Sequence, residues 1–154
     1  MRPLPKSWGP VIGWAILIFL FSTDQFSSSN TIRIVGPLIR WIFPNASLEL
    51  QQSIHAFVRK LGHWSEYFIF SLLLLRAFRG EERNEWKGRW ALSTLVLVLF
   101  YALSDELHQV FVPSRTAHFR DSMLDFFGGS CAVFWKYLSR NRRPRAGSTK
   151  HERN

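Results

Sequence analysis

The chain has 154 residues, a formal net charge of +9 and 47% apolar residues. This length fits one domain, and the apolar fraction is no higher than in an average globular protein, so composition alone excludes neither a soluble nor a membrane protein. The positive charge fits either a nucleic-acid-binding protein or the cytoplasmic segments of a membrane protein. Because the basic clusters repeatedly flank apolar runs, the sequence favours the membrane and argues against nucleic acid as a partner.

The first apolar run, Trp8–Ser22, follows Arg2 and Lys6. It is similar to a signal peptide, but Phe21 and the residues after it offer no small-x-small cleavage site. We therefore expect an uncleaved first span. At about 1.5 Å per residue the run reaches only about 22 Å, which is short of a hydrocarbon core of about 30 Å.

A long loop is predicted over residues 23–62, on the outer side of the membrane. Within it, residues 32–43 are apolar and contain a predicted break at Gly36-Pro37, which favours an interfacial or re-entrant segment. After Pro44 the apolar residues recur at helical spacing, which predicts an amphipathic helix on the outer surface leading into the second span. These residues are Leu50, Ile54, Phe57, Val58 and Leu61.

Three further short spans are expected at residues 63–78, 90–110 and 121–138. The fourth carries small residues, Gly128 and Gly129, that favour close helix packing. The sequence thus predicts an all-α membrane protein with four short transmembrane helices and an outer amphipathic or re-entrant segment between the first two. We expect residues 1–138 to form this transmembrane domain and the basic residues 139–154 a disordered cytoplasmic tail.

The topology follows from the positions of the positive charges. If the amino terminus is cytoplasmic, the cytoplasmic segments hold 14 of the 20 Lys and Arg residues. Lys and Arg are concentrated in the cytoplasmic loops of membrane proteins, so we expect both termini to be cytoplasmic.

Polar residues gather at the outer ends of all four predicted spans. Helical spacing places several of them on shared faces, as with Asp105 and Gln109 or Asp121 and Asp125. Carboxylates near hydrocarbon need a partner, a proton, a metal ion or water. The predicted functional cluster is Ser22, His63, Glu66, Tyr67, Asp105, Glu106, Gln109, Arg115, Asp121 and Asp125. If a divalent metal is bound, its candidate ligands are His63, Glu66, Glu106 and Asp121.

Structural interpretations of the same residues stay open. Asp121 precedes an apolar run and could be the N-cap of the fourth span, and His63 could be an ordinary interfacial residue. Arg115 could neutralise Asp105 or Glu106 in an ion pair. The adjacent Asp105 and Glu106 are the least easily explained, because two carboxylates at a helix carboxyl end repel each other and oppose the helix dipole.

The chain resembles the VanZ-like family of small bacterial membrane proteins. The most specific stretch is residues 101–129, which is similar to the family pattern Asp-Glu-x-x-Gln, Pro-x-Arg, Asp-x-x-x-(Asp/Asn)-x-x-Gly. Residues 60–67 and Ser22 also match. Ser114 stands where Gly is common, and Asp125 where Asn is common, which weakens any mechanism that demands a carboxylate there. The resemblance implies a role in the cell envelope, in the cytoplasmic (inner) membrane, with a possible part in resistance to glycopeptides such as teicoplanin. It implies no particular reaction.

Three functions are compatible with this cluster. The first is binding of an amphiphile or lipid headgroup at the outer leaflet, with membrane lipids, a lipid-linked cell-wall precursor or a lipoglycopeptide as partner. The second is an intramembrane hydrolase or transferase acting on an envelope lipid, with a possible divalent metal as cofactor. The third is a polar network that only fixes the helices.

Overall fold

The computed structural model describes residues 6–23, 28–80, 86–112 and 119–140. Within these residues all regular secondary structure is helical, which confirms the predicted all-α class. A short 3-10 helix, Lys6–Trp8, leads into the first α-helix. The α-helices are α1 (Gly9–Phe21), α2 (Ser28–Ile42), α3 (Leu48–Arg79), α4 (Gly88–Val110) and α5 (Phe119–Arg140).

Local sequence explains where the helices begin and end. Pro10 lies in the first turn of α1, where its missing N–H leaves no hydrogen bond unmade. Ser47 caps α3, because its Oγ accepts a hydrogen bond of 3.2 Å from the Leu50 N–H. Gly80 ends α3 with φ of +53°, a backbone conformation that residues with a side chain rarely adopt.

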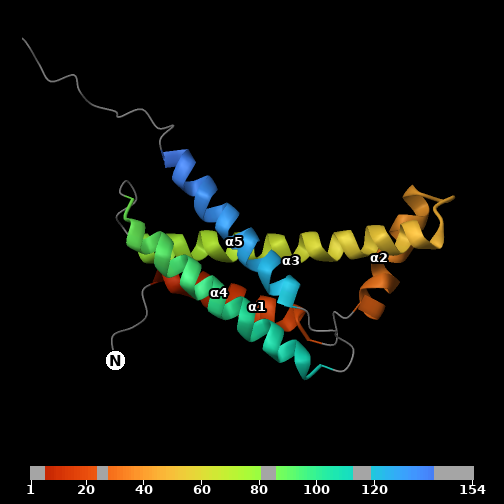
Figure 1. Ribbon diagram of the computed structural model, residues 1–154, viewed down its shortest axis with the longest axis horizontal. Helices are drawn as coiled ribbons and strands as arrows, with labels where there is room; N and C mark the ends of the chain where they lie inside the picture. The colour runs from red at the N-terminus through yellow and green to blue at the C-terminus, as the bar shows by residue number, and fades with distance from the viewer. Residues whose placement is uncertain (1–5, 24–27, 81–85, 113–118, 141–154) are drawn as a thin grey trace, which may run out of the picture.

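The helices form a bundle with a projecting arm (Figure 1). α1, α4 and α5 all pack on the carboxyl-terminal part of α3, and α5 crosses α3 diagonally. The first part of α3 extends beyond them and packs against α2. Among the described side chains of this arm only Ile39 and His55 are buried.

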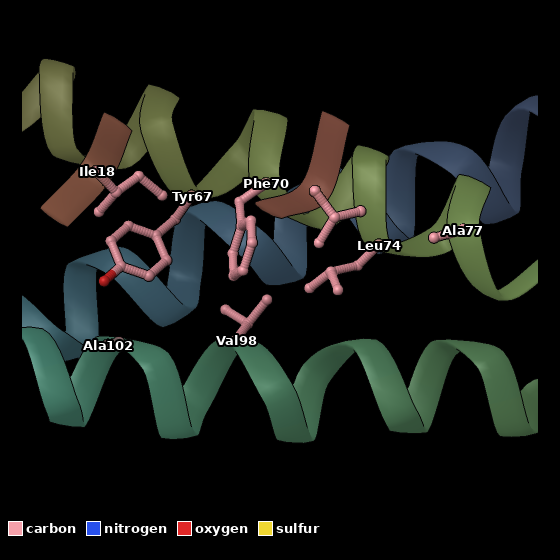
Figure 2. Close-up of a cluster of buried hydrophobic side chains, with 8 residues drawn as sticks. Ile18, Tyr67, Phe70, Leu74, Ala77, Val98 and Ala102 are labelled. Carbon is pink, nitrogen blue, oxygen red and sulfur yellow. The ribbon is translucent and has the colours of Figure 1, made fainter. Parts of the chain in front are cut away.

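The core lies where α1, α3, α4 and α5 meet. Tyr67, Phe70 and Leu74 of α3 face Val98 and Ala102 of α4 across the bundle (Figure 2). Further along, a second cluster consists of Leu75, Trp90 and Val133.

Close approach of α5 depends on two glycines. A Cβ on Gly128 would collide with the backbone carbonyl of Trp64, and one on Gly129 would lie 2.6 Å from Ser71 Oγ and 2.7 Å from Val98 Cγ1. At Gly128 the obstacle is backbone, so a side chain there would displace α5, whereas at Gly129 the side chains of Ser71 and Val98 would have to move. The small surface predicted for this helix therefore has the expected packing role.

Three sequence-based predictions need correction. The outer amphipathic helix and the second span, which were predicted as separate elements, are one continuous helix that runs through Gly62 without a Pro to interrupt it. The predicted break at Gly36-Pro37 is wrong, because α2 runs through Pro37 at the cost of one backbone hydrogen bond. Asp121 lies within the first turn of α5, which begins at Phe119, and so does not precede the helix as an N-cap would.

The number of membrane spans is supported only in part. Among the described helices, α4 is long and apolar enough to cross a membrane by length and composition, and Lys6–Ser22 is apolar but shorter.

Candidate functional site

The candidate site begins on the buried stripe of α4. Its buried side chains recur every three or four residues, so they share one helix face, and the last two are Asp105 and Gln109. The stripe consists of Trp90, Thr94, Val98, Ala102, Asp105 and Gln109. The buried face of α4 is thus largely apolar over most of its length and ends in two buried polar side chains.

Gln109 joins α4 to the end of α1. Its amide Nε2 donates to Ser22 Oγ at 3.0 Å and to Asp105 Oδ2 at 3.1 Å. One amide nitrogen carries two hydrogens and can make both bonds. All three side chains are buried, so the bonds replace those that water would otherwise supply.

His63 of α3 faces Asp125 of α5. The Nδ1 and Oδ1 atoms lie 3.7 Å apart, with 16% of the His63 side chain exposed and 3% of the Asp125 side chain. This separation is longer than a hydrogen bond, for which about 2.9 Å is usual. Among the described residues, no group donates a hydrogen bond to Asp125 Oδ1.

The two pairs are neighbours. One ligand-type atom from each of His63, Asp105 and Asp125 can be chosen so that all three lie within 4.8 Å of one another. An imidazole and two carboxylates at this spacing are a donor set that a divalent metal ion can bind. The sequence-based list of metal candidates shares only His63 with this group.

Tyr67 approaches the same place from α3. It is fully buried, and its hydroxyl points toward α4 near Ala102, one turn before Asp105 (Figure 2). The hydroxyl is close enough to Asp105 and Asp125 to interact with them electrostatically. Within the described part of the chain it has no hydrogen-bond partner.

The other predicted site residues lie around this centre. Glu66 and Asp121 are half-buried, and neither belongs to the three-residue group. Asp105 and Glu106, although adjacent, have different surroundings: Asp105 is buried, whereas Glu106 lines a surface groove. Their expected repulsion is reduced because the two side chains leave the helix in different directions. Arg115 lies outside the described residues.

Sequence reasoning missed three hydrogen bonds that connect the helices around the site. Trp14 Nε1 donates to the Glu66 carbonyl at 2.9 Å, and the Tyr101 hydroxyl donates to the Ala15 carbonyl at 2.6 Å. Ser122 Oγ donates to the Ala102 carbonyl at 3.3 Å.

A family model described as VanZ/LLP1 matches residues 8–139, nearly the whole chain. The chain belongs to the VanZ/LLP1 family. The matched region contains every residue of the candidate site, and the predicted family resemblance is confirmed. None of the curated proteins and none of the solved structures matches the chain.

Proposed function

We propose that this VanZ/LLP1 protein is a multi-pass protein of the bacterial cytoplasmic membrane. Its spans would be α1, the second part of α3, α4 and α5. The support comes from large apolar side chains exposed on the outer faces of the bundle, since an extended apolar surface needs cover other than water. They include Ile12, Ile16, Phe19, Leu92, Val96, Phe100, Phe127 and Phe134.

The projecting arm fits the membrane surface better than the bilayer centre. α3 has 32 residues and is about 48 Å long, more than a hydrocarbon core of about 30 Å accommodates. Large apolar side chains are also exposed along the arm, including Trp41 and Phe57, among polar neighbours. Such an amphipathic segment can lie in the headgroup region, where its apolar face is buried.

Cysteine labelling tests the topology. In a Cys131→Ala background, Ser27→Cys should react with an impermeant thiol reagent added to intact cells, and Glu85→Cys should react only after lysis. This pattern would place the end of α1 at the outer side and the end of α3 at the cytoplasmic side, as the proposed topology requires. The reverse pattern would overturn the outer-leaflet location.

The function that we propose is binding of an amphiphile, a lipid or a lipid-linked molecule, at the outer leaflet. One observation carries it: an open groove of about 320 Å³ lies beside the polar cluster. Its wall is apolar except for the Glu106 carboxylate and for Ser122, whose hydroxyl is bonded to the Ala102 carbonyl, and one carboxylate in an apolar wall suits a molecule with a hydrocarbon part and a polar part. The lining residues are Leu103, Glu106, Leu107, Val110, Phe119 and Ser122.

The polar groups near the groove indicate the class of headgroup. Glu106 can accept hydrogen bonds from hydroxyl, amide or ammonium groups of a ligand. Arg120, exposed beside Phe119 at the start of α5, can bind a phosphate oxygen. A phospholipid and a polyprenyl-phosphate-linked cell-wall precursor combine a phosphate with a hydrocarbon tail, and a lipoglycopeptide combines hydroxyl, amide and ammonium groups with one.

Native mass spectrometry of the protein extracted in its own lipids tests this function. Val110→Trp, which fills the groove, should lose most of a bound lipid, whereas Leu92→Trp on the exposed face of the same helix should keep it. Glu106→Gln should weaken retention several-fold, and Glu49→Gln on the exposed arm is its matched control. Equal retention in all four variants would refute the groove as the binding site.

The second candidate is an intramembrane, metal-dependent hydrolase or transferase acting on the same class of lipid. The group of His63, Asp105 and Asp125 is the observation in its favour. Incubation of the retained lipid with the protein, followed by mass analysis of the products, separates turnover from binding.

A role in glycopeptide resistance would appear as a raised inhibitory concentration of teicoplanin in cells that express the protein. This increase should be lost in cells that express Val110→Trp.

A further inference from the structure

We propose that His63, Asp105 and Asp125 bind one Zn²⁺ ion inside the helix bundle, with the Tyr67 hydroxyl beside it. The inference stands on the geometry of these side chains and does not require that the groove bind a lipid. It names a cofactor and its ligands, which the lipid-binding proposal leaves open.

The distances agree with a metal better than with direct bonding. Zinc binds nitrogen and carboxylate oxygen at about 2.1 Å, so ligand atoms of a tetrahedral site lie about 3.4 Å apart. The 3.7 Å between His63 Nδ1 and Asp125 Oδ1 is close to this value and too long for a hydrogen bond. The ligand atoms of the full group lie within 4.8 Å of one another. Side-chain rotation would therefore have to shorten these distances by less than about 1.5 Å to reach the spacing of about 3.4 Å in a tetrahedral zinc site.

Charge leads to the same ion. Two carboxylates share a buried space with one imidazole, so even a protonated imidazole leaves these three side chains with a net negative charge when both carboxylates are ionised. Buried charge without compensation costs several kcal/mol per ion, by typical magnitudes. A divalent cation neutralises both carboxylates at once. The single imidazole favours zinc over magnesium and calcium, which prefer oxygen ligands alone.

The surroundings contain the outer contacts that metal ligands usually have. Gln109 donates to Asp105 Oδ2 and also to Ser22 Oγ, so the Asp105 carboxylate is held in one orientation, as metal-ligating carboxylates usually are. The buried Tyr67 hydroxyl points to this end of the core and lacks a hydrogen-bond partner among the described residues. It can bind to a fourth ligand on zinc, such as water or a phosphate oxygen, or reach the ion directly.

The experiment uses untagged full-length protein in detergent or nanodiscs, stripped with a chelator and then dialysed against Zn²⁺. Wild type should retain one zinc per chain by elemental analysis, and zinc should raise its Tm by several degrees. Asp125→Asn and His63→Gln should each weaken zinc binding at least tenfold and abolish the rise in Tm. Glu49→Gln, an exposed carboxylate on the arm and outside the group, is the control and should behave as wild type.

Helix content measured by circular dichroism shows which variants are folded. If Asp125→Asn does not fold, His63→Gln, whose side chain is partly exposed, decides the question. Stoichiometric zinc in both ligand variants, or no more than a trace in wild type at micromolar zinc, would overturn the proposal. Lipid retention measured on the same samples is a separate result: zinc loss with lipid retained leaves the amphiphile-binding function intact.

Discussion

The two ends of the bundle core differ in chemistry although the same helices build both. The apolar end consists of Leu75, Trp90 and Val133. The polar end consists of Ser22, His63, Asp105, Gln109 and Asp125.

α4 and α5 change from apolar to polar buried side chains at the same height in the bundle. α4 and α5 run in opposite directions, since Gly129 lies against Val98 and Ser122 against Ala102. α4 therefore reaches its polar residues at its carboxyl end, and α5 carries Asp125 near its start. Burial of apolar surface stabilises one end, whereas the other depends on matched polar partners. The packing of the apolar part holds the polar side chains in position.

The most severe test of this dependence is Gly128→Ala. The added Cβ would meet the Trp64 carbonyl, a backbone atom that cannot move aside, so α5 must shift away from α3. We expect unfolding in mixed micelles to become easier by about 3 kcal/mol. Because Trp64 follows His63, the shift should also separate His63 from Asp125 and reduce zinc binding.

Gly13→Ala is the control for this change. A Cβ there meets nothing within 4 Å, so only helix propensity changes, in the favourable direction. Equal stability of the two alanine variants would mean that close packing at Gly128 does not position the polar end.

Gln109→Leu tests the polar end itself. Leucine has a similar size but donates no hydrogen bond, so Ser22 Oγ and Asp105 Oδ2 each lose a partner in a buried place. We expect a loss of about 2 kcal/mol in the free energy of unfolding. Gln52→Leu, on the exposed arm, should change it by less than about 0.5 kcal/mol. If Gln109→Leu leaves the free energy of unfolding unchanged, water replaces these hydrogen bonds and the polar end of the bundle is accessible to solvent.

The sequence predicted much of this arrangement because helical periodicity is a local property. The spacing of Asp105 and Gln109 by four residues placed them on one face, and the structure joins them by a hydrogen bond. Because successive spans alternate in direction, the end of the first span was expected to lie beside the end of the third. The hydrogen bond from Gln109 to Ser22 agrees with this expectation.

Other features depend on contacts between distant segments, which periodicity does not contain. Nothing local separates Asp105, which turns inward, from Glu106, which lines the groove. The pairing of His63 with Asp125 depends on how closely α5 approaches α3 at Gly128. Spacing predicts helix on both sides of Gly62 but not that one helix crosses from the outer segment into the span, as α3 does.

Thr94→Val tests the part of the core next to the apolar end, and we expect it to stabilise the protein, whereas the preceding variants destabilise it. The Thr94 hydroxyl is fully buried and has no hydrogen-bond partner among the described residues, and valine replaces it with a methyl group of the same shape. Removing an unsatisfied hydroxyl should raise the free energy of unfolding by about 1 kcal/mol, seen as a higher Tm. Ser122→Ala, which removes a hydrogen bond to Ala102, should lower it instead. If both variants change the free energy of unfolding in the same direction, the stability of the two ends does not differ in its dependence on hydrogen bonds.

The smallest expected effect is the coupling between two hydrogen bonds that join α1 to the bundle between its two ends. Tyr101→Phe removes one hydrogen bond to the Ala15 carbonyl, and Trp14→Phe removes one to the Glu66 carbonyl. Tyr101→Phe should cost about 1 kcal/mol for the lost hydrogen bond, and Trp14→Phe should cost more than this because the larger Trp14 ring also packs against the core. The two bonds hold adjacent residues of α1, so the double variant should lose less than the sum of the single losses, by at least about 0.5 kcal/mol. Strict additivity in chemical unfolding would mean that α4 and α3 hold α1 independently, and that Ser22 reaches Gln109 without help from these contacts.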